Sequence, residues 1–405
     1  MFSNIKKTLG LDSNSNVIDK DALIIDVRSK AEFASGHVQC AINIPLELIE
    51  IKADELKSQK QIIVYCRSGN RSEHARRLLN EKGLRNVINA GSLQEAHDIL
   101  VNAGTFDAEI VTEEIEEIVT YKKNTDKDTA LLKILIPTDF SVQADFSYLL
   151  VKRLEEHLTV ETHFVHIIDV PDTVGLDGHG NITTCGDIDK NYVQNQVNLA
   201  ELKLKQLKVQ YGEAIHTHLR FGKLTETINT FAQDMHFDLV VMGTKGSWGL
   251  KEKLTTTKSQ LLVRKSDIPV LTLMCDRSDL VINDVLYIHD FTDGDNTDVP
   301  IMHKFSEFFH TTFHLLHIEA LNSTHNKEAI TNNMKLYAEK HNLKKSAYHI
   351  VQASDVEQGV KEFLKTQDAD LVFIGTHGKG GKFHKSHAET LVKHLFKPII
   401  TFHFN

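Results

Sequence analysis

Residues 238–246 read Asp-Leu-Val-Val-Met-Gly-Thr-Lys-Gly, and residues 370–378 repeat the pattern as Asp-Leu-Val-Phe-Ile-Gly-Thr-His-Gly. In each copy a continuous apolar run precedes a glycine-rich turn, which is typical of a strand buried on both faces of a parallel sheet. Further segments recur in the same order: 133–141 returns at 285–292, and 269–273 returns at 398–402. A repeat of this length indicates a duplicated domain rather than a solenoid.

The repeat predicts two α/β domains, at residues 131–276 and 283–405. Equivalent positions lie 151 residues apart at the first strand but 132 apart at the glycine strand, so the first copy carries 19 extra residues. We assign these residues to the polar, glycine-rich segment 172–191 and expect it to form a lid over the cleft of the first copy.

Residues 1–104 predict a separate domain of the same class. The apolar runs at 23–27 and 62–65 have the length of strands, and residues 72–79 have a strongly helical composition. Strands that alternate with helices predict a parallel sheet. From residue 105 to residue 130 the apolar spacing weakens and charges accumulate, which indicates a solvated linker.

Composition and charge narrow the range of functions. The 405 residues are 41% hydrophobic and 25% charged, with a net charge of −9 and no basic block. This balance argues against binding to nucleic acid or to a membrane surface, because both need a positive patch. No apolar run approaches the length of about 18 residues that a membrane span requires.

The cysteines and the amino terminus indicate a reducing compartment. Cys40, Cys66, Cys185 and Cys275 lie at wide, unpatterned spacing, which does not predict a disulfide framework or a CxxC zinc motif. The first residues lead into polar sequence rather than an apolar signal core. We therefore expect a cytoplasmic protein with reduced thiols.

A short loop joins a buried strand to a helix in the first domain, with the sequence Cys-Arg-Ser-Gly-Asn-Arg at 66–71. The backbone N–H groups of such a loop converge on an anion, and the helix dipole adds to their attraction. This field and the two arginines should favour the thiolate and make the cysteine a nucleophile. The candidate catalytic residues are Cys66, Arg67, Ser68, Gly69, Asn70 and Arg71. The competing interpretation is an inert cysteine at a strand end.

The first domain resembles the single-domain rhodanese family over residues 20–104. The resemblance is carried by the loop and by Asp26-Val27-Arg28, Glu32-Phe33, Gly36-His37 and Ala41-Ile42-Asn43-Ile44-Pro45. It implies that Cys66 takes a sulfane sulfur from thiosulfate or a persulfide donor and carries it as a persulfide. A small thiophile or a protein thiol would accept the sulfur, and no cofactor would be required. In this picture the loop amides hold the persulfide, and Arg67 and Arg71 orient the donor.

Two comparisons refine this resemblance. Tyrosine-phosphatase loops place five residues between cysteine and arginine, whereas four lie between Cys66 and Arg71, and the smaller cradle suits sulfur better than phosphate. Rhodaneses usually have Gly-Gly and a later Trp after the helix, whereas residues 89–93 here read Asn-Ala-Gly-Ser-Leu. We expect this departure to change the rim of the pocket.

Other polar residues of the first domain are expected to have structural roles. We interpret Asp26, Arg28, Glu32 and His37 as scaffold residues that hold the loop. Cys40 is expected to be a small packed residue rather than a second, resolving thiol.

Each duplicated domain begins with a strand that ends in an aspartate and later has a strand that ends in Gly-x-x-Gly. In an open parallel sheet both features lie at the carboxyl ends of the strands, where ligands bind. Glycines allow the backbone to approach phosphates closely, and the following helix contributes its N–H groups.

These domains resemble universal stress proteins in tandem. Nucleotide-binding members of that family have Gly-x-x-Gly followed, nine residues later, by Gly-Ser or Gly-Thr. The resemblance implies that the first copy binds ATP through Asp139, Gly243, Gly246 and Thr257, although Thr256 replaces the third glycine. The corresponding residues of the second copy are Asp290, Gly375, Gly378 and Ser386, after a loop three residues shorter. The second copy is alternatively a structural partner.

The predicted fold is therefore a rhodanese-like domain followed by two Rossmann-like universal stress protein domains, similar to the adenine nucleotide alpha hydrolase class. We expect the two copies to pair as a pseudo-dimer through the edge strands near residues 270 and 399, and a homodimer is also open. The preferred function is a sulfurtransferase fused to a stress module. The alternative is a non-enzymatic nucleotide-binding or persulfide-sensing protein. Zinc binding by His377, His384 and His387 is a weaker hypothesis, and we assign no metal ligands.

Overall fold

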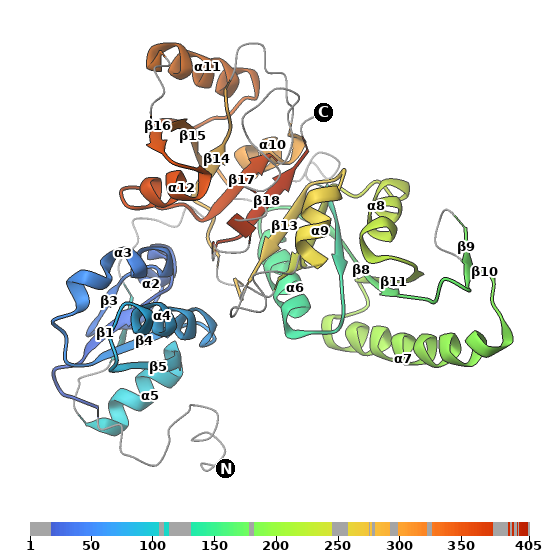
Figure 1. The fold of residues 1–405 in the computed structure, drawn as a ribbon, viewed down its shortest axis with the longest axis horizontal. Helices are drawn as coiled ribbons and strands as arrows, with labels where there is room; N and C mark the ends of the chain where they lie inside the picture. Colours follow the sequence, from blue (N-terminus) through green and yellow to red (C-terminus); the bar gives the residue numbers. More distant parts are fainter. Residues whose placement is uncertain are drawn as a thin grey trace. The chain divides into compact units, whose positions relative to one another are not determined.

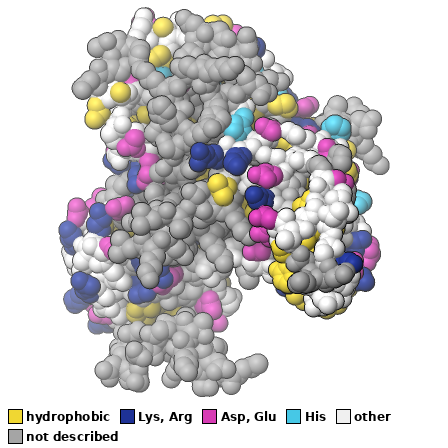
Figure 2. All heavy atoms as spheres, turned by 45° about the vertical axis from the view of Figure 1, so that its right-hand side comes forward, with side chains coloured by type: hydrophobic (Ala, Val, Ile, Leu, Met, Phe, Trp, Pro, Cys, Tyr) yellow, Lys and Arg dark blue, Asp and Glu magenta, His cyan; other side chains and the backbone are white. Residues whose placement is uncertain are grey.

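The computed structural model describes residues 18–104, 109–112, 131–177, 182–244, 258–274, 276–277, 280–291, 299–321, 326–375, 388, 391–392, 395 and 397–403. These residues form two compact units, the first essentially residues 18–112 and the second essentially residues 131–403 (Figure 1). On the face drawn in Figure 2, lysine and arginine side chains lie among acidic ones.

The first unit is built on a parallel sheet of four strands in the order β3-β1-β4-β5. The strands are β1 (Leu23–Asp26), β3 (Ala41–Asn43), β4 (Ile62–Cys66) and β5 (Val87–Ser92), and the helices are α2 (Lys30–Ala34), α3 (Leu46–Leu56), α4 (Asn70–Glu81) and α5 (Leu93–Ala103). Every residue of β4 is buried, as its apolar run predicts for a central strand. The predicted parallel α/β fold is confirmed.

The boundary predicted at residue 105 is wrong. Strand β6 (Ile110–Val111) pairs antiparallel with β2 (His37–Val38), and the Gln39 N–H donates to the Glu109 carbonyl at 2.8 Å. The first unit therefore extends past the predicted start of the linker. A strand of two residues is too short to produce a recognisable apolar period, so the surrounding charges dominated the prediction.

The second unit contains one sheet of ten strands in the order β11-β8-β7-β12-β13-β18-β17-β14-β15-β16. The first half has β7 (Leu131–Pro137), β8 (Thr159–Ile168), β11 (His216–Phe221), β12 (Leu239–Gly243) and β13 (Val270–Leu273). The second half has β14 (Asp284–Ile288), β15 (Thr312–Ala320), β16 (Ser346–Ala353), β17 (Leu371–Gly375) and β18 (Ile399–Phe402). Numbered along the chain, each half has the order 3-2-1-4-5, so the sequence repeat corresponds to a repeated topology.

Helices complete both halves (Figure 1). They are α6 (Val142–Leu154), α7 (Asp187–Tyr211), α8 (Leu224–Asp234) and α9 (Lys258–Lys265) in the first half, and α10 (Pro300–Phe308), α11 (Lys327–Lys340) and α12 (Val356–Leu364) in the second. Among the described residues, no helix combines the length and the apolar character needed to cross a bilayer.

The extra residues of the first copy form more than a loop. Strands β9 (Gly175–Leu176) and β10 (Ile182–Thr184) pair as an antiparallel hairpin, and α7 begins at Asp187, within the predicted segment. Helix α7 has 25 residues, whereas its counterpart α11 has 14. The insertion is therefore divided between the hairpin and a longer helix, and the proposal that it acts as a lid stays a prediction.

The two halves of the sheet meet where β13 and β18 pair antiparallel. Leu271 lies opposite Ile400, and the hydroxyl of Thr401 donates to the Val270 carbonyl at 3.2 Å. Each strand covers an edge that would otherwise expose unpaired backbone groups. These are the strands near residues 270 and 399 that the sequence singled out, and the interpretation of the arrangement as a pseudo-dimer stays a prediction.

A substitution at this junction tests the continuous sheet. Ile400 is fully buried, so Ile400→Ala should lower the free energy of unfolding of the second unit by about 2–5 kcal/mol. Leu336 on α11 is 62% exposed, and Leu336→Ala should change it by less than about 0.5 kcal/mol. Urea unfolding of the full chain measures both. Equal effects of the two substitutions would contradict the buried junction.

Candidate functional site

Cys66 is the last residue of β4 and lies at the base of the loop that leads into α4. Its side chain is buried, and the Gly69 N–H points at the sulfur, with 3.2 Å between N and Sγ. The hydroxyl of Ser72, in the first turn of α4, lies 3.4 Å from the same sulfur. The Gly69 N–H, at the start of a helix, therefore faces Sγ, an arrangement that stabilises negative charge on sulfur.

The rest of the loop faces solvent to different degrees. Ser68 and Asn70 are exposed, and Arg67 is half-buried. Gly69 adopts a left-handed conformation with φ +84°, and a Cβ there would lie 3.4 Å from the Cα of Gly91 on β5. Glycine is thus favoured at this position by backbone conformation as well as by close packing. The loop residues predicted from the sequence are brought together around Cys66, with Arg71 as the exception.

Arg71 does not lie where the sequence analysis placed it. Its side chain is 2% exposed, and its guanidinium donates to both carboxylate oxygens of Glu32 on α2, at 2.6 and 2.5 Å. The prediction that Arg71 orients an anionic donor is not supported by this position. A buried guanidinium needs a charged partner, and the bidentate geometry of Glu32 supplies one.

A second buried ion pair lies close to the first in sequence. Arg28 donates to both oxygens of Asp26, the last residue of β1, and to the Gly36 carbonyl at 2.5 Å. Burial raises the pKa of Asp26 above its ordinary value, and the bonds from Arg28 oppose that rise. His37 stacks on Phe33 with ring centroids 3.6 Å apart. Their burial and pairing confirm the expectation of scaffold residues.

Sequence reasoning missed two residues of this site, Ser72 and Asn89. The hydroxyl of Ser72 also lies 2.7 Å from the Asn89 Oδ1 on β5, and the Asn89 amide donates to the Gly69 carbonyl at 3.2 Å. Asn89 therefore ties the loop to β5. The only signal for it was the departure from the Gly-Gly pattern of rhodaneses.

The expectation for Cys40 is wrong, because this residue is exposed rather than packed. It lies between β2 and β3, which are short strands of two and three residues. The small size of a cysteine suggested packing, but the surrounding backbone leaves it at the surface.

In the second unit, Asp139 and Gly243 follow neighbouring strands. Asp139 is exposed two residues after β7, Gly243 ends β12, and β7 pairs in parallel with β12. A Cβ on Gly243 would lie 2.0 Å from the Gln143 carbonyl oxygen, so glycine is required there by the approach of α6. From β7 the chain adds β8 and β11 on one side, and it then returns to add β12 and β13 on the other side. The boundary between β7 and β12 is therefore the switch point where open α/β sheets bind ligands.

The second half places its residues in the same way. Asp290 is half-buried after β14, Gly375 ends β17, and these strands are also parallel neighbours. Several predicted residues lie outside the described residues: Gly246, Thr257, Gly378 and Ser386, together with the histidines His377, His384 and His387.

A phenylalanine with positive φ follows the aspartate in both halves. Phe140 has φ 62° and Phe291 has φ 49°, a conformation that bulky residues rarely adopt. Phe140 packs on His166, with 4.6 Å between ring centroids, and Lys203 lies 5.0 Å from its ring. Phe291 is 2% exposed and packs on Tyr287 and Tyr337. Sequence reasoning did not find this shared backbone turn.

Two protein families match the chain. The rhodanese-like domain matches residues 12–98, and the universal stress protein family matches residues 131–273. Among curated proteins, the thiosulfate sulfurtransferase PspE of Escherichia coli is 38% identical over 73 residues, which cover 18% of this chain and 70% of PspE.

Other relatives match over smaller shares or in the second unit. A sulfurtransferase of Allochromatium vinosum is 37% identical over 70 residues, 17% of this chain and 65% of that protein. The chain thus spans slightly less than two thirds of this relative. The universal stress protein MJ0531 of Methanocaldococcus jannaschii is 29% identical over 144 residues, 35% of this chain and 81% of that protein.

The comparison with solved structures covers more of the chain than the universal stress protein family match at residues 131–273. The crystal structure of a universal stress protein from Archaeoglobus fulgidus aligns with a TM-score of 0.50 and 17% identity, covering 67% of this chain and 96% of that chain. This likeness concerns the fold alone. The chain belongs to the rhodanese family through residues 12–98, and it joins that domain to a universal stress protein domain at residues 131–273.

Proposed function

We propose that the first unit is a sulfurtransferase in which Cys66 carries the transferred sulfur. The Cys66 thiolate attacks the outer sulfur of thiosulfate, a new S–S bond forms, and sulfite leaves with the electron pair of the broken S–S bond. An acceptor thiolate, or cyanide in an assay, then attacks the outer sulfur of the Cys66 persulfide, and the Cys66 thiolate leaves. A persulfide donor can replace thiosulfate, and no cofactor takes part.

The observation that carries this proposal is the Gly69 N–H, which points at Cys66 Sγ from 3.2 Å, so charge on the leaving and attacking sulfur is stabilised at the base of the loop. The Ser72 hydroxyl lies 3.4 Å from the same sulfur and donates to the Asn89 Oδ1 at 2.7 Å. Ser68 and Asn70 of the same loop are exposed, and Arg67 is half-buried, so solvent reaches the loop that holds the sulfur. The names of the sulfurtransferase relatives agree with this chemistry.

The position of Arg71 argues against the phosphatase alternative. A cysteine phosphatase needs a loop arginine to hold the phosphate during transfer, in the bidentate manner typical of guanidinium groups. Here the Arg71 guanidinium is buried and bound to Glu32. We propose that Arg71 positions the loop and that Arg67 is the arginine that meets the donor.

Thiosulfate-to-cyanide transfer by the full chain tests the proposal. Cys66→Ser should reduce turnover to the uncatalysed rate, because serine cannot carry the sulfane sulfur. Cys40→Ser is the matched control, since Cys40 is the exposed free cysteine of the same unit, and it should keep wild-type turnover.

Mass spectrometry of the protein treated with thiosulfate should show one added sulfur on Cys66. A wild-type protein that forms this persulfide, but transfers it to neither cyanide nor thiols, would contradict the enzyme and favour the persulfide sensor. Equal turnover in Cys66→Ser and wild type would contradict both.

The role of Glu32 gives a separate prediction. Glu32→Ala leaves the Arg71 guanidinium buried without its carboxylate partner and should destabilise the first unit by about 3–5 kcal/mol. Glu50 and Lys82 form a pair at 3.1 Å whose side chains are both 45% exposed, so Glu50→Ala should cost less than about 1 kcal/mol. Calorimetric unfolding of the full chain measures both variants, and similar losses would rule out a structural role for the buried pair.

We infer further that the first half of the second unit binds ATP. Asp139 and Gly243 lie at the carboxyl ends of β7 and β12, which flank the switch point of the sheet. Asp290 and Gly375 lie in the corresponding place, and we propose that the second half is mainly a structural partner of the first.

Binding of ATP to the full chain, measured by calorimetry, separates the two halves. Asp139→Ala should weaken binding at least tenfold, about 1.4 kcal/mol, whereas Asp290→Ala should leave it unchanged. Both aspartates lie after their strands rather than inside the sheet, so the variants should fold. The reverse pattern would assign the nucleotide to the second half, and no effect of either variant would overturn the proposed site.

We propose a cytoplasmic location and a role in stress response for the fusion, with pairing of the two stress-protein copies inside the chain and a possible homodimer. The widely spaced cysteines and the family match of the second unit support this setting. The negative net charge agrees with a protein that binds neither nucleic acid nor membranes.

A further inference from the structure

Four polar side chains gather on one face of the sheet at strands β8 and β11. In the parallel register of these strands, His216 lies opposite His163 and His218 lies opposite Val165. Glu161 is two residues before His163 on β8. Because side chains alternate between the faces of a strand, Glu161, His163, His216 and His218 point to the same side of the sheet.

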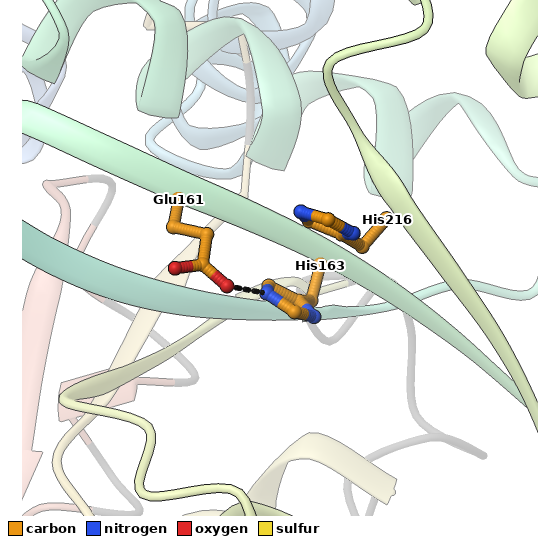
Figure 3. Close-up of side chains that lie close together, drawn as sticks. All are labelled: Glu161, His163 and His216. Atoms are coloured by element: carbon orange, nitrogen blue, oxygen red, sulfur yellow. Dashed lines mark hydrogen bonds and ion pairs between the residues drawn. The ribbon is translucent and has the colours of Figure 1, made fainter.

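The geometry of this cluster is that of a ligand set. One donor atom each from Glu161, His163 and His216 lies within 4.8 Å of the others. Figure 3 shows the His216 ring over the His163 ring, with the Glu161 carboxylate at their edge, and the ring centroids are 4.4 Å apart. The Glu161 Oε1 lies 2.6 Å from the His163 Nε2. The carboxylate and a nitrogen of the buried histidine therefore already meet.

The other ring nitrogen of His163, Nδ1, has a hydrogen-bond partner of its own. His163 Nδ1 lies 2.8 Å from His218 Nε2, and His163 itself is 3% exposed. Without a metal, His163 Nε2–H donates to Glu161, and Nδ1 accepts from His218. A metal on Nε2 would replace that proton, and His163 Nδ1–H would then donate to His218. A histidine that binds a metal commonly has its second N–H oriented by such a partner.

The second half of the sheet provides an internal comparison. There His314 lies 2.8 Å from Asp284 and 3.0 Å from His349, which reproduces the chain of carboxylate, histidine and histidine. The residue opposite His314 on β16 is Ala347, whereas the residue opposite His163 on β11 is His216. The hydrogen-bonded row of one carboxylate and two histidines occurs in both halves, so it needs no metal to explain it. His216 is the addition that turns it into a set of three ligands in the first half.

We propose that Glu161, His163 and His216 bind a divalent transition-metal ion of the zinc class. Two imidazole nitrogens and one carboxylate oxygen are ligands that zinc takes in proteins, and a water completes the tetrahedron. Zinc bonds of about 2.0–2.2 Å place tetrahedral donors about 3.4 Å apart, so the outer ligands must close by roughly an ångström. The exposed His216 and the half-buried Glu161 have the freedom to do so.

A lysine on the neighbouring strand has its ammonium group bound to another partner. Lys133 lies opposite Glu161 on β7, but its ammonium group donates to the Met235 carbonyl at 2.8 Å and lies 5.1 Å from the Phe237 ring centre. The Glu161 carboxylate is thus available to a cation.

The position of the site suggests its effect. Strand β11 is the edge strand of the ten-stranded sheet, and His216 is its first residue. A bound ion would link β11 to β8 toward the amino-terminal ends of these strands. Asp139 and Gly243 lie instead at the carboxyl-terminal ends of β7 and β12. The site is therefore separate from the proposed nucleotide site.

Zinc chloride titrated into chelator-dialysed full-length protein tests the proposal by calorimetry. The starting protein is Cys66→Ser, because a reactive thiolate also binds zinc. One equivalent of zinc should bind, and both His216→Ala and Glu161→Gln should weaken that binding at least tenfold. His216→Ala gives the first half the residue that the second half already has. His97→Ala removes a histidine from α5 of the first unit and should change nothing.

Two further measurements keep the result specific. Cobalt(II) in place of zinc should give the visible absorption of a nitrogen–oxygen site, and the band should disappear in His216→Ala. Metal-free melting temperatures of His216→Ala and the starting protein should agree, because His216 is exposed. Absence of zinc binding, or binding unchanged in His216→Ala, overturns the site. Loss of binding only when His377, His384 and His387 are replaced together by alanine also overturns it.

Discussion

The bidentate pair between Glu32 and Arg71 holds the first unit in the arrangement that its proposed chemistry needs. Both side chains are nearly inaccessible to water, and an ion in such surroundings is tolerated only with a well-placed partner. The pair joins α2 to the first turn of α4. The loop at 66–70 lies between β4 and that turn, so the pair limits how far Gly69 and Ser72 can move from the Cys66 sulfur. In the proposed sulfurtransferase, Arg71 would thereby position the loop without touching the donor.

In the second unit, histidines rather than arginines are the hydrogen-bond partners of carboxylates. In each half, hydrogen bonds among a carboxylate and two histidines connect neighbouring strands. The residues are Glu161, His163 and His218 in the first half, and Asp284, His314 and His349 in the second. Imidazole has two nitrogens, so one ring can satisfy a carboxylate on one side and a second ring on the other. The halves differ in the carboxylate, which is on the strand of the central histidine in the first half and on the neighbouring strand in the second. They also differ at the position opposite that histidine, which is His216 in the first half and Ala347 in the second.

Both units use the carboxyl ends of parallel strands for their proposed chemistry. Cys66 ends β4, and Asp139 and Gly243 follow or end β7 and β12. Helices begin at this edge, and their first N–H groups attract anions such as thiosulfate or a nucleotide phosphate. The proposed metal ligands instead lie near the start of β8 and β11, strands that follow the carboxyl ends of α6 and α7, where the helix dipole is negative. In the second unit, the proposed anion site and the proposed cation site therefore lie at opposite ends of the parallel strands.

The sequence by itself determined the α/β class, the internal sequence repeat and the strand-to-helix loop that holds Cys66, because these depend on local apolar period and on motifs contiguous in the chain. It placed Arg71 beside the donor and Cys40 in the core, and it overlooked Ser72, Asn89 and the Glu161–His163–His216 cluster. Only tertiary structure decided these positions. Each depends on which side chain faces which neighbour across strands, and strand register is set by packing of the whole sheet rather than by any one segment.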